Sequence, residues 1–272
     1  MNSVLRKLRA ALKTTAVFAL VSGIGGVTPA SAQKWHFGIG TGLARLNVEG
    51  DQGLNVALGG VGPVQFEVDL SPDDFQDLMQ SAIGGGGYAT DGKWMIQFAF
   101  AQLKLGGDPS TTLPNGERLS SDLSFDITTG EVTVGYPLYR GPGGKVSISP
   151  FVGFRYIKHD IGISLTLTGA TTNTATVGRD WNWTDVLVGG TVNVAMAPKV
   201  SWSGGVNAAF GGSNGTFDVQ TAVTWRLWRG LSISPNGWFT KIDYENGNRG
   251  DADWYLYDVN EFGSGLTAMV NF

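Results

Sequence analysis

The chain has 272 residues, of which 41 are glycine, none is cysteine and 15% are charged. The lack of cysteine excludes disulfides, thiolate nucleophiles and cysteine-ligated metal sites. Acidic residues outnumber basic ones by 23 to 19, and this balance argues against a nucleic-acid partner.

The first 32 residues have the organisation of a secretory signal peptide. It comprises four basic residues, a short apolar run and a small-residue cleavage site: Arg6, Lys7, Arg9 and Lys13, then Ala16 to about Val27, then Pro29 to Ala32. A spanning helix needs ~20 apolar residues, so we expect cleavage after Ala32 rather than a membrane anchor. Cleavage removes four of the 19 basic residues and none of the 23 acids, so the mature chain carries a net charge of about −8.

Residues 33–272 are expected to form a single domain, and they contain no apolar stretch of helix length. If this domain enters a membrane, it must do so as a closed β-barrel, because open sheet edges are excluded from lipid. The first expected strand covers 35–48 and alternates apolar with small residues. The alternation slips near Ala44 and Arg45, which predicts a β-bulge.

One helix is expected, at 72–82. Ser71 is a suitable N-cap, a proline occupies the first helical position, acidic residues follow in the first turn, and Gly84 is a stop signal. Its apolar face includes Phe75 and Leu78. We predict that this face packs on the barrel mouth or lumen and narrows it.

The remaining strands are about ten to twelve residues long, with a period of two and aromatic residues at both ends, as membrane-spanning strands require. They are expected at 83–90, 94–105, 123–139, 146–158, 186–196, 200–210, 217–227, 231–244 and 262–272. The fold class is therefore all-β: a transmembrane antiparallel up-and-down barrel of about ten strands. Eight is the alternative, because strand 83–90 is weak and could belong to a loop.

Short and long connections alternate along the chain. Short turns are expected at 91–92, 142–144, 197–199 and 228–230, and long loops at 49–82, 106–121, 159–182 and 245–260; only the link at 211–215 is short where a long one is expected. Outer-membrane barrels have short periplasmic turns and longer external loops. An even number of strands would return both termini to the periplasm.

Four features resemble one group of bacterial envelope proteins. They are the acidic helix from Ser71 to Met79, a hairpin from Gly87 to Leu105, the segment with Trp183, Asp185, Val188 and Gly189, and the pair Asp243 and Tyr244. The chain is thus similar to small outer-membrane β-barrel proteins of Gram-negative bacteria, a poorly characterised OmpA-like or porin-like family. The resemblance implies a fold, a place in the cell outer membrane, and contact with its lipid and lipopolysaccharide. It implies no reaction.

Charged residues on the inward phase of the strands are candidates for a polar network in the lumen. They are Glu131, Arg155, Asp185, Asp218 and Arg226. They could line a selective pore, but a salt-bridged plug is favoured, because about ten strands leave little more room than side chains fill. Arg155 and Asp185 lie at similar depth on adjacent strands, so we predict an ion pair between them.

The two histidines, His36 and His159, are expected at opposite mouths of the barrel. Outer-membrane proteases and lipid-modifying barrels place a catalytic histidine beside a carboxylate or serine at the outer rim, and only His159 could play that part. An ordinary rim position is favoured. The acidic last loop offers oxygen ligands for calcium, but acidic loops are more often only solvated. It contains Glu245, Asn246, Asn248, Asp251, Asp253, Asp258 and Glu261.

The last strand ends in an aromatic residue at the carboxyl terminus. This ending resembles the signal by which the barrel-assembly machinery recognises its clients, and the residues that carry it are Leu266, Ala268, Val270 and Phe272. They share the outward phase of the strand. The resemblance therefore implies the assembly machinery as a partner.

Three classes of function fit these observations. We expect a structural or interaction barrel with a narrow, side-chain-filled lumen, because this class needs no convergent site. A small channel or uptake protein for small solutes is the alternative and needs a continuous water path. A rim-active enzyme is the least expected, so we predict no catalytic residues, no cofactor and no metal.

Overall fold

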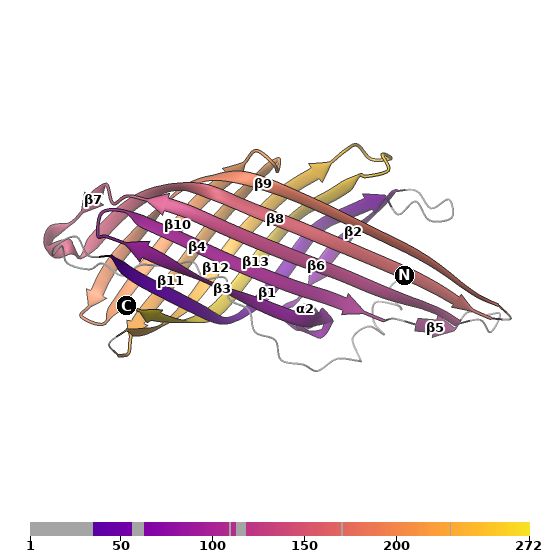
Figure 1. The fold of residues 1–272 in the computed structure, drawn as a ribbon, viewed down its shortest axis with the longest axis horizontal. Coiled ribbons are helices and arrows are strands. Elements are labelled where there is room, and N and C mark those ends of the chain that lie inside the picture. Colours follow the sequence, from indigo (N-terminus) through magenta and orange to yellow (C-terminus); the bar gives the residue numbers. More distant parts are fainter. Residues whose placement is uncertain (1–34, 56–62, 109, 113–117, 170, 229) are drawn as a thin grey trace.

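A computed structural model describes residues 35–55, 63–108, 110–112, 118–169, 171–228 and 230–272. Ten long strands form the wall of a barrel (Figure 1). They are β1 (His36–Asn55), β3 (Met79–Thr90), β4 (Met95–Gly107), β6 (Arg118–Gly135), β8 (Val146–Thr168), β9 (Thr172–Ala197), β10 (Val200–Phe210), β11 (Gly215–Arg226), β12 (Leu231–Asn246) and β13 (Tyr255–Asn271). The predicted signal peptide at 1–32 lies outside the described residues.

Antiparallel pairing closes the wall into a ring. Each of the ten strands pairs with its neighbour in the chain order of the ring, and β1 pairs with β13 from Gly38↔Asn271 to Leu54↔Tyr255. Three short strands extend it: β2 (Pro63–Leu70) pairs with β1, β5 (Ser110–Thr112) with β6, and β7 (Tyr139–Arg140) with β8. The prediction of ten strands is confirmed, and the alternative of eight is wrong.

The wall departs from the sequence-based expectation in its first strand and in its long loops. β1 and β13 pair in unbroken register through Ala44 and Arg45, so the predicted bulge is wrong. The alternation of apolar residues slips there because the outward side chains of β1 become polar where the strand leaves the apolar band. The expected loop 49–82 contains β2 and the end of β1, and most of the expected loop 159–182 is a hairpin of β8 and β9.

The single predicted α-helix is present but short. It is α2 (Pro72–Leu78), where Asp74 donates its backbone N–H to the Ser71 hydroxyl, the expected N-cap. The chain turns extended at Met79, because 79–90 pair with β4, so the predicted end at residue 82 is wrong. A second, 3-10 helix, η1 (Pro142–Gly144), forms the expected turn before β8. Among the described residues, no helix is long and apolar enough to cross a membrane.

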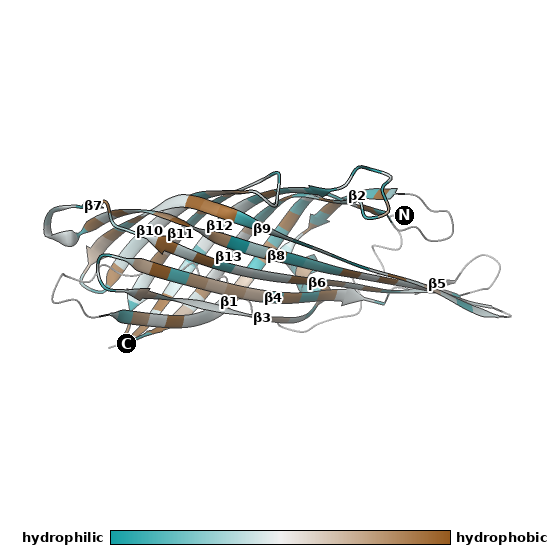
Figure 2. Cartoon of the chain, turned by 45° about the horizontal axis from the view of Figure 1, so that its top comes forward, coloured by the Kyte–Doolittle hydropathy of each residue, from teal (hydrophilic) through white to brown (hydrophobic). Residues whose placement is uncertain are grey.

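An apolar band surrounds the half of the barrel that carries the short turns and the C terminus (Figure 2). Exposed side chains of this band include Ile39, Leu43, Phe98, Phe100, Val152, Phe154, Val206, Phe217, Leu266 and Val270, with Trp35, Trp94, Tyr136, Trp225 and Trp228 near the short turns. Farther along the same strands the exposed side chains are charged: Arg45, Lys104, Asp160, Lys241 and Asp258. This sequence of zones is typical of a membrane-spanning barrel, with the short turns on the periplasmic side.

We expect Phe75→Ala to lower the free energy of unfolding by about 3 kcal/mol or more. Phe75 is only 3% exposed and belongs to the core cluster at the outer end of the lumen, whereas Phe66 on β2 is 40% exposed. Urea unfolding in detergent, followed by tryptophan fluorescence, measures the change. Phe66→Ala is the matched control. An equal loss of stability in both variants would contradict the prediction that the apolar face of the helix packs on the barrel lumen.

Candidate functional site

The lumen changes in character from the periplasmic end to the outer end. Along β12 the inward side chains are, in order, Ser232, Ser234, Asn236, Trp238, Thr240, Ile242 and Tyr244. Along β13, read back from the C terminus, they are Asn271, Met269, Thr267, Gly265, Gly263, Glu261, Val259, Tyr257 and Tyr255. The lumen therefore contains a hydrophilic cavity, then a charged layer, then an aromatic cluster.

The charged layer is centred on Arg155 of β8. Its guanidinium lies 2.9 Å from the Glu131 carboxylate on the adjacent β6 and 2.9 Å from the Asp218 carboxylate on β11, which is three strands away. Thr240 donates its hydroxyl to the second oxygen of Asp218 at 2.7 Å. The Arg155 side chain is 12% exposed, so both ion pairs are largely shielded from water. Three of the five predicted lumen residues thus meet, and they tie opposite parts of the wall together.

Asp185 has a different role from the predicted one. It is the Cα partner of Arg155 across β8 and β9, yet its carboxylate accepts hydrogen bonds from the backbone N–H groups of Gly212 and Ser213 and from the Ser213 hydroxyl. These three donors, at 2.8 to 2.9 Å, satisfy the carboxylate. The predicted Arg155–Asp185 pair is therefore wrong. Asp185 instead stabilises the tight external turn at 211–214, the link that is short where a long loop is expected.

Above the charged layer, aromatic side chains surround His159. The ring centroids of Phe125, Trp183 and Tyr257 lie 4.6 to 5.0 Å from the imidazole, all in edge-on geometry. His159 Nδ1 lies 2.7 Å from the Tyr255 hydroxyl. Two stacked pairs complete the cluster: Trp181 on Tyr255 at 4.2 Å and Trp183 on Tyr244 at 3.9 Å. Phe75 of α2 belongs to the same core cluster.

The aromatic cluster is electrically neutral at its centre. Burial lowers the pKa of His159 to about 3, and it raises the pKa of the Tyr255 and Tyr257 hydroxyls well above their usual range. At neutral pH the hydrogen bond between His159 and Tyr255 thus joins two uncharged groups. The expected position of His159 as an ordinary rim residue is wrong, because its side chain is buried inside the barrel.

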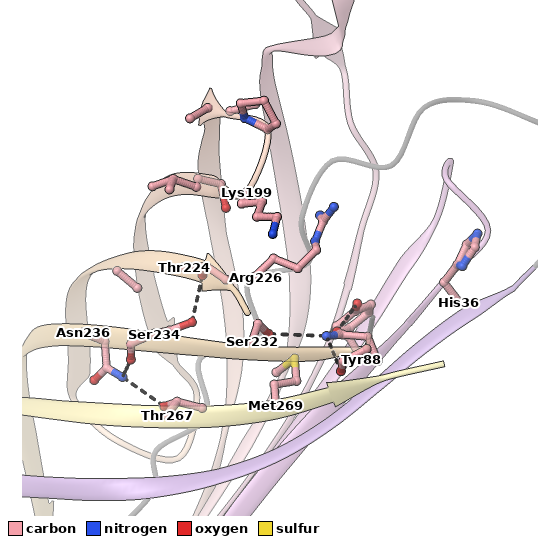
Figure 3. A pocket seen from close by; sticks show the side chains of 18 of the residues that line it. His36, Tyr88, Lys199, Thr224, Arg226, Ser232, Ser234, Asn236, Thr267 and Met269 are labelled. Carbon is pink, nitrogen blue, oxygen red and sulfur yellow. Dashed lines mark hydrogen bonds between the residues drawn. The ribbon is translucent and has the colours of Figure 1, made fainter. Parts of the chain in front are cut away.

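A cavity of about 470 Å³ occupies the periplasmic end of the lumen (Figure 3). Arg226, the fifth predicted lumen residue, lines this cavity and is far along β11 from Asp218. His36, the other histidine, lines it as well. The Trp238 ring lies over the cavity side of the charged layer, directly against Gly263, where a Cβ would overlap it. The arrangement of the lumen is thus an open vestibule beneath filled layers.

No protein-family model and no curated protein matches the chain. Among solved structures, the outer membrane protease OmpT from Escherichia coli matches with a TM-score of 0.55 at 9% identity, over 90% of this chain and 98% of OmpT. The chain has the fold of an outer-membrane β-barrel. Two further matches are Neisserial surface protein A (8% identity, 88% of this chain and 97% of that one, TM-score 0.29) and the translocator domain of the autotransporter NalP from Neisseria meningitidis (11% identity, 88% and 89%, TM-score 0.40).

Sequence reasoning missed one charged residue of the barrel lumen. Glu261 was grouped with the acidic last loop, but it is part of β13 and accepts a hydrogen bond from the Tyr257 hydroxyl at 3.2 Å. The signal was available, because the period of two in the last strand continues backward through Tyr257 and Tyr255. The same period links Trp181 and Trp183 to Asp185, so the aromatic cluster was also readable as an inward face.

The acids that remain in the last external loop of the barrel mostly stabilise its turn. Asn248 donates its backbone N–H to Asp251 at 2.7 Å, and Trp254 donates its indole N–H to Glu245 at 2.8 Å. In the described part of the chain, no group of three or more histidine or acidic side chains is arranged to hold a metal ion. The calcium alternative therefore gains no support from the loop.

The proposed assembly residues lie on the lipid-facing side of the barrel seam. Leu266, Val270 and Phe272 are exposed apolar side chains, and Ala268 shares their face. Phe272 also pairs its backbone with Phe37 of β1 in both directions, at 2.8 and 3.3 Å. Phe272 thus helps to close the ring between β13 and β1. Recognition of these residues by the assembly machinery stays a prediction.

Proposed function

We propose that this protein is a non-conducting outer-membrane barrel with a structural or interaction role. The observation that carries this proposal is the filled lumen. Arg155, its two carboxylate partners and the aromatic cluster occupy successive levels between the periplasmic cavity and the outer end. A path for ions or solutes would require these layers to come apart. The channel or uptake alternative is therefore disfavoured.

A sheet that projects beyond the barrel supports an interaction role. β8 and β9 continue as a paired hairpin to Thr168 and Thr172, flanked by β6 on one side (Figure 1). In the described part of the chain, β10 pairs with β9 only from Val186 to Ala197, so the outer half of β9 has an open edge. An open edge offers backbone hydrogen-bonding groups to an extended segment of another protein.

OmpT is described as a protease, but we do not propose protease activity for this chain. The chain has only two histidines. His159 is buried among aromatic rings, with a tyrosine hydroxyl as its hydrogen-bond partner, and His36 lies at the periplasmic mouth. Among the described residues, neither histidine side chain forms a hydrogen bond with a carboxylate or a serine, which the enzyme alternative needs at the outer rim.

Planar-bilayer recordings of the purified full-length protein test the proposal. We expect no stable channel steps for the wild type, because the lumen is filled at two levels. The variant Arg155→Ala/Trp183→Ala/Tyr255→Ala removes the guanidinium at the centre of the charged layer and two large rings of the aromatic cluster, so it opens both levels, and we expect it to show steps.

The matched control is Trp228→Ala, since Trp228 is an exposed ring near a periplasmic turn, outside the lumen. It should remain silent like the wild type. Stable steps of equal size in the wild type and the triple variant would contradict a closed lumen and favour the channel alternative.

A further inference from the structure

The periplasmic cavity has the size and position of a ligand site. Its volume of about 470 Å³ falls in the range of ~300 to 1,000 Å³ that is usual for small-molecule pockets. The ends of β9 to β13 and the turn at Lys199 surround it, with Tyr88 of β3 contributing from the other side of the seam. Farther along the inward face of β12, beyond the cavity-lining Asn236, come Trp238 and then Thr240 of the charged layer.

The electrostatics of the cavity favour a negatively charged ligand. Lys199 and Arg226 extend into the same space, and His36 lies at its edge (Figure 3). No aspartate or glutamate is among the described residues that line it. Neither Lys199 nor Arg226 forms an ion pair with a described residue, although the chain has 23 acidic and 19 basic residues. The two cations are thus available for an anion.

Polar side chains below the cations provide a set of fixed hydrogen-bonding groups. Tyr88 donates its hydroxyl to Asn271 at 2.8 Å, and Asn271 in turn donates to Ser232 at 3.4 Å. The hydroxyls of Thr224 and Ser234 lie 2.8 Å apart. All five side chains line the cavity, and they come from four strands. Their mutual bonds hold them in position, which lowers the entropic cost of binding a ligand.

We propose that this cavity binds a small organic phosphate. A guanidinium matches a phosphate with two parallel hydrogen bonds, and an ammonium group adds a compact positive charge. The hydroxyl groups of the wall can donate to further phosphate oxygens or to the organic part of the ligand. Met269, Ala195 and Ala222 supply an apolar surface for its carbon atoms. Two permanent cations in one cavity favour a phosphate, which carries up to two negative charges, over a single carboxylate.

The same chemistry has two possible sources. A soluble phosphate ester would arrive from the periplasm, whereas a phospholipid headgroup would arrive from the adjacent inner leaflet of the membrane. Isothermal titration of the purified full-length protein with glycerol 3-phosphate measures the first. Native mass spectrometry of protein released from phosphatidylglycerol vesicles measures the second, as a retained lipid adduct.

Arg226→Gln and Lys199→Gln should each lower the affinity for the probe about 10- to 100-fold, the effect of losing one hydrogen bond to a charged group. Both residues are exposed, so the barrel should fold normally. Lys93→Gln is the matched control, because Lys93 is an exposed cation of the neighbouring periplasmic turn and does not line the cavity. It should bind like the wild type.

Each outcome decides. Titration that depends on Arg226 and Lys199 indicates a soluble ester, and a lipid adduct with the same dependence indicates a headgroup. Absence of both, or equal binding in the wild type and both cavity variants, would overturn the proposal. The result is independent of whether the lumen conducts.

Discussion

Replacing Arg155 by methionine should lower the free energy of unfolding by about 3 to 5 kcal/mol, because two carboxylates then remain in the lumen without their cation. Glu131 and Asp218 both pair with this guanidinium, and Asp218 also accepts a hydrogen bond from Thr240. Unfolding in urea, followed by the heat-modifiable gel mobility that distinguishes folded from unfolded barrels, measures the loss.

Neutralising the two carboxylates left without a cation, Glu131 and Asp218, should recover part of that loss in stability. Arg155→Met/Glu131→Gln/Asp218→Asn removes both carboxylates that paired with Arg155, so the variant should be more stable than Arg155→Met alone. Arg45→Met is the control, since Arg45 pairs with Asp73 on the exposed surface and its loss should change the free energy of unfolding little.

The stability loss from Asp185→Ala should add to the loss from Arg155→Met, because the two side chains have separate partners. Strong coupling between them would show that they interact after all.

Acid should destabilise the wild type through His159. Its pKa falls from 6.5 in the unfolded chain to about 3 in the barrel, because burial disfavours the charged imidazole. The unfolded state therefore binds one more proton over this interval, and stability decreases as the pH falls from about 6.5 to about 3. The full interval corresponds to a loss on the order of 3 to 5 kcal/mol.

Carboxylates titrate in the same range, so the readout is the difference between variants. His159→Gln should flatten the decline in the urea midpoint between pH 6.5 and 4.5, even if the variant is less stable throughout. His36→Gln is the matched control, because it removes an imidazole at the periplasmic mouth, outside the aromatic cluster. An unchanged slope in His159→Gln would mean that the imidazole is protonated without disturbing the aromatic cluster.

The fold could be predicted from the sequence, because the signals for a barrel are local. A period of two selects strands, turn residues such as those at 91–92 place the hairpins, and an outward face that is apolar for about one membrane thickness identifies lipid. The N-cap at Ser71 likewise predicted where α2 begins. The inward phase of Glu131, Arg155 and Asp218 was also correct, since alternation alone decides which face a side chain takes.

Which inward groups meet depends on how the strands are arranged around the closed ring. The partner of Arg155 on β11 is far away in the sequence and is brought near by the closure of the ring, so neighbouring strands alone predicted the wrong acid. The Asp185 carboxylate instead accepts hydrogen bonds from backbone N–H groups of a turn, and no side-chain pattern in the sequence predicts such bonds. His159 became a core residue because β6, β8, β9 and β13 continue beyond the apolar band and enclose it. The periplasmic cavity arises in the same way, as the space that the strand ends leave when the barrel closes.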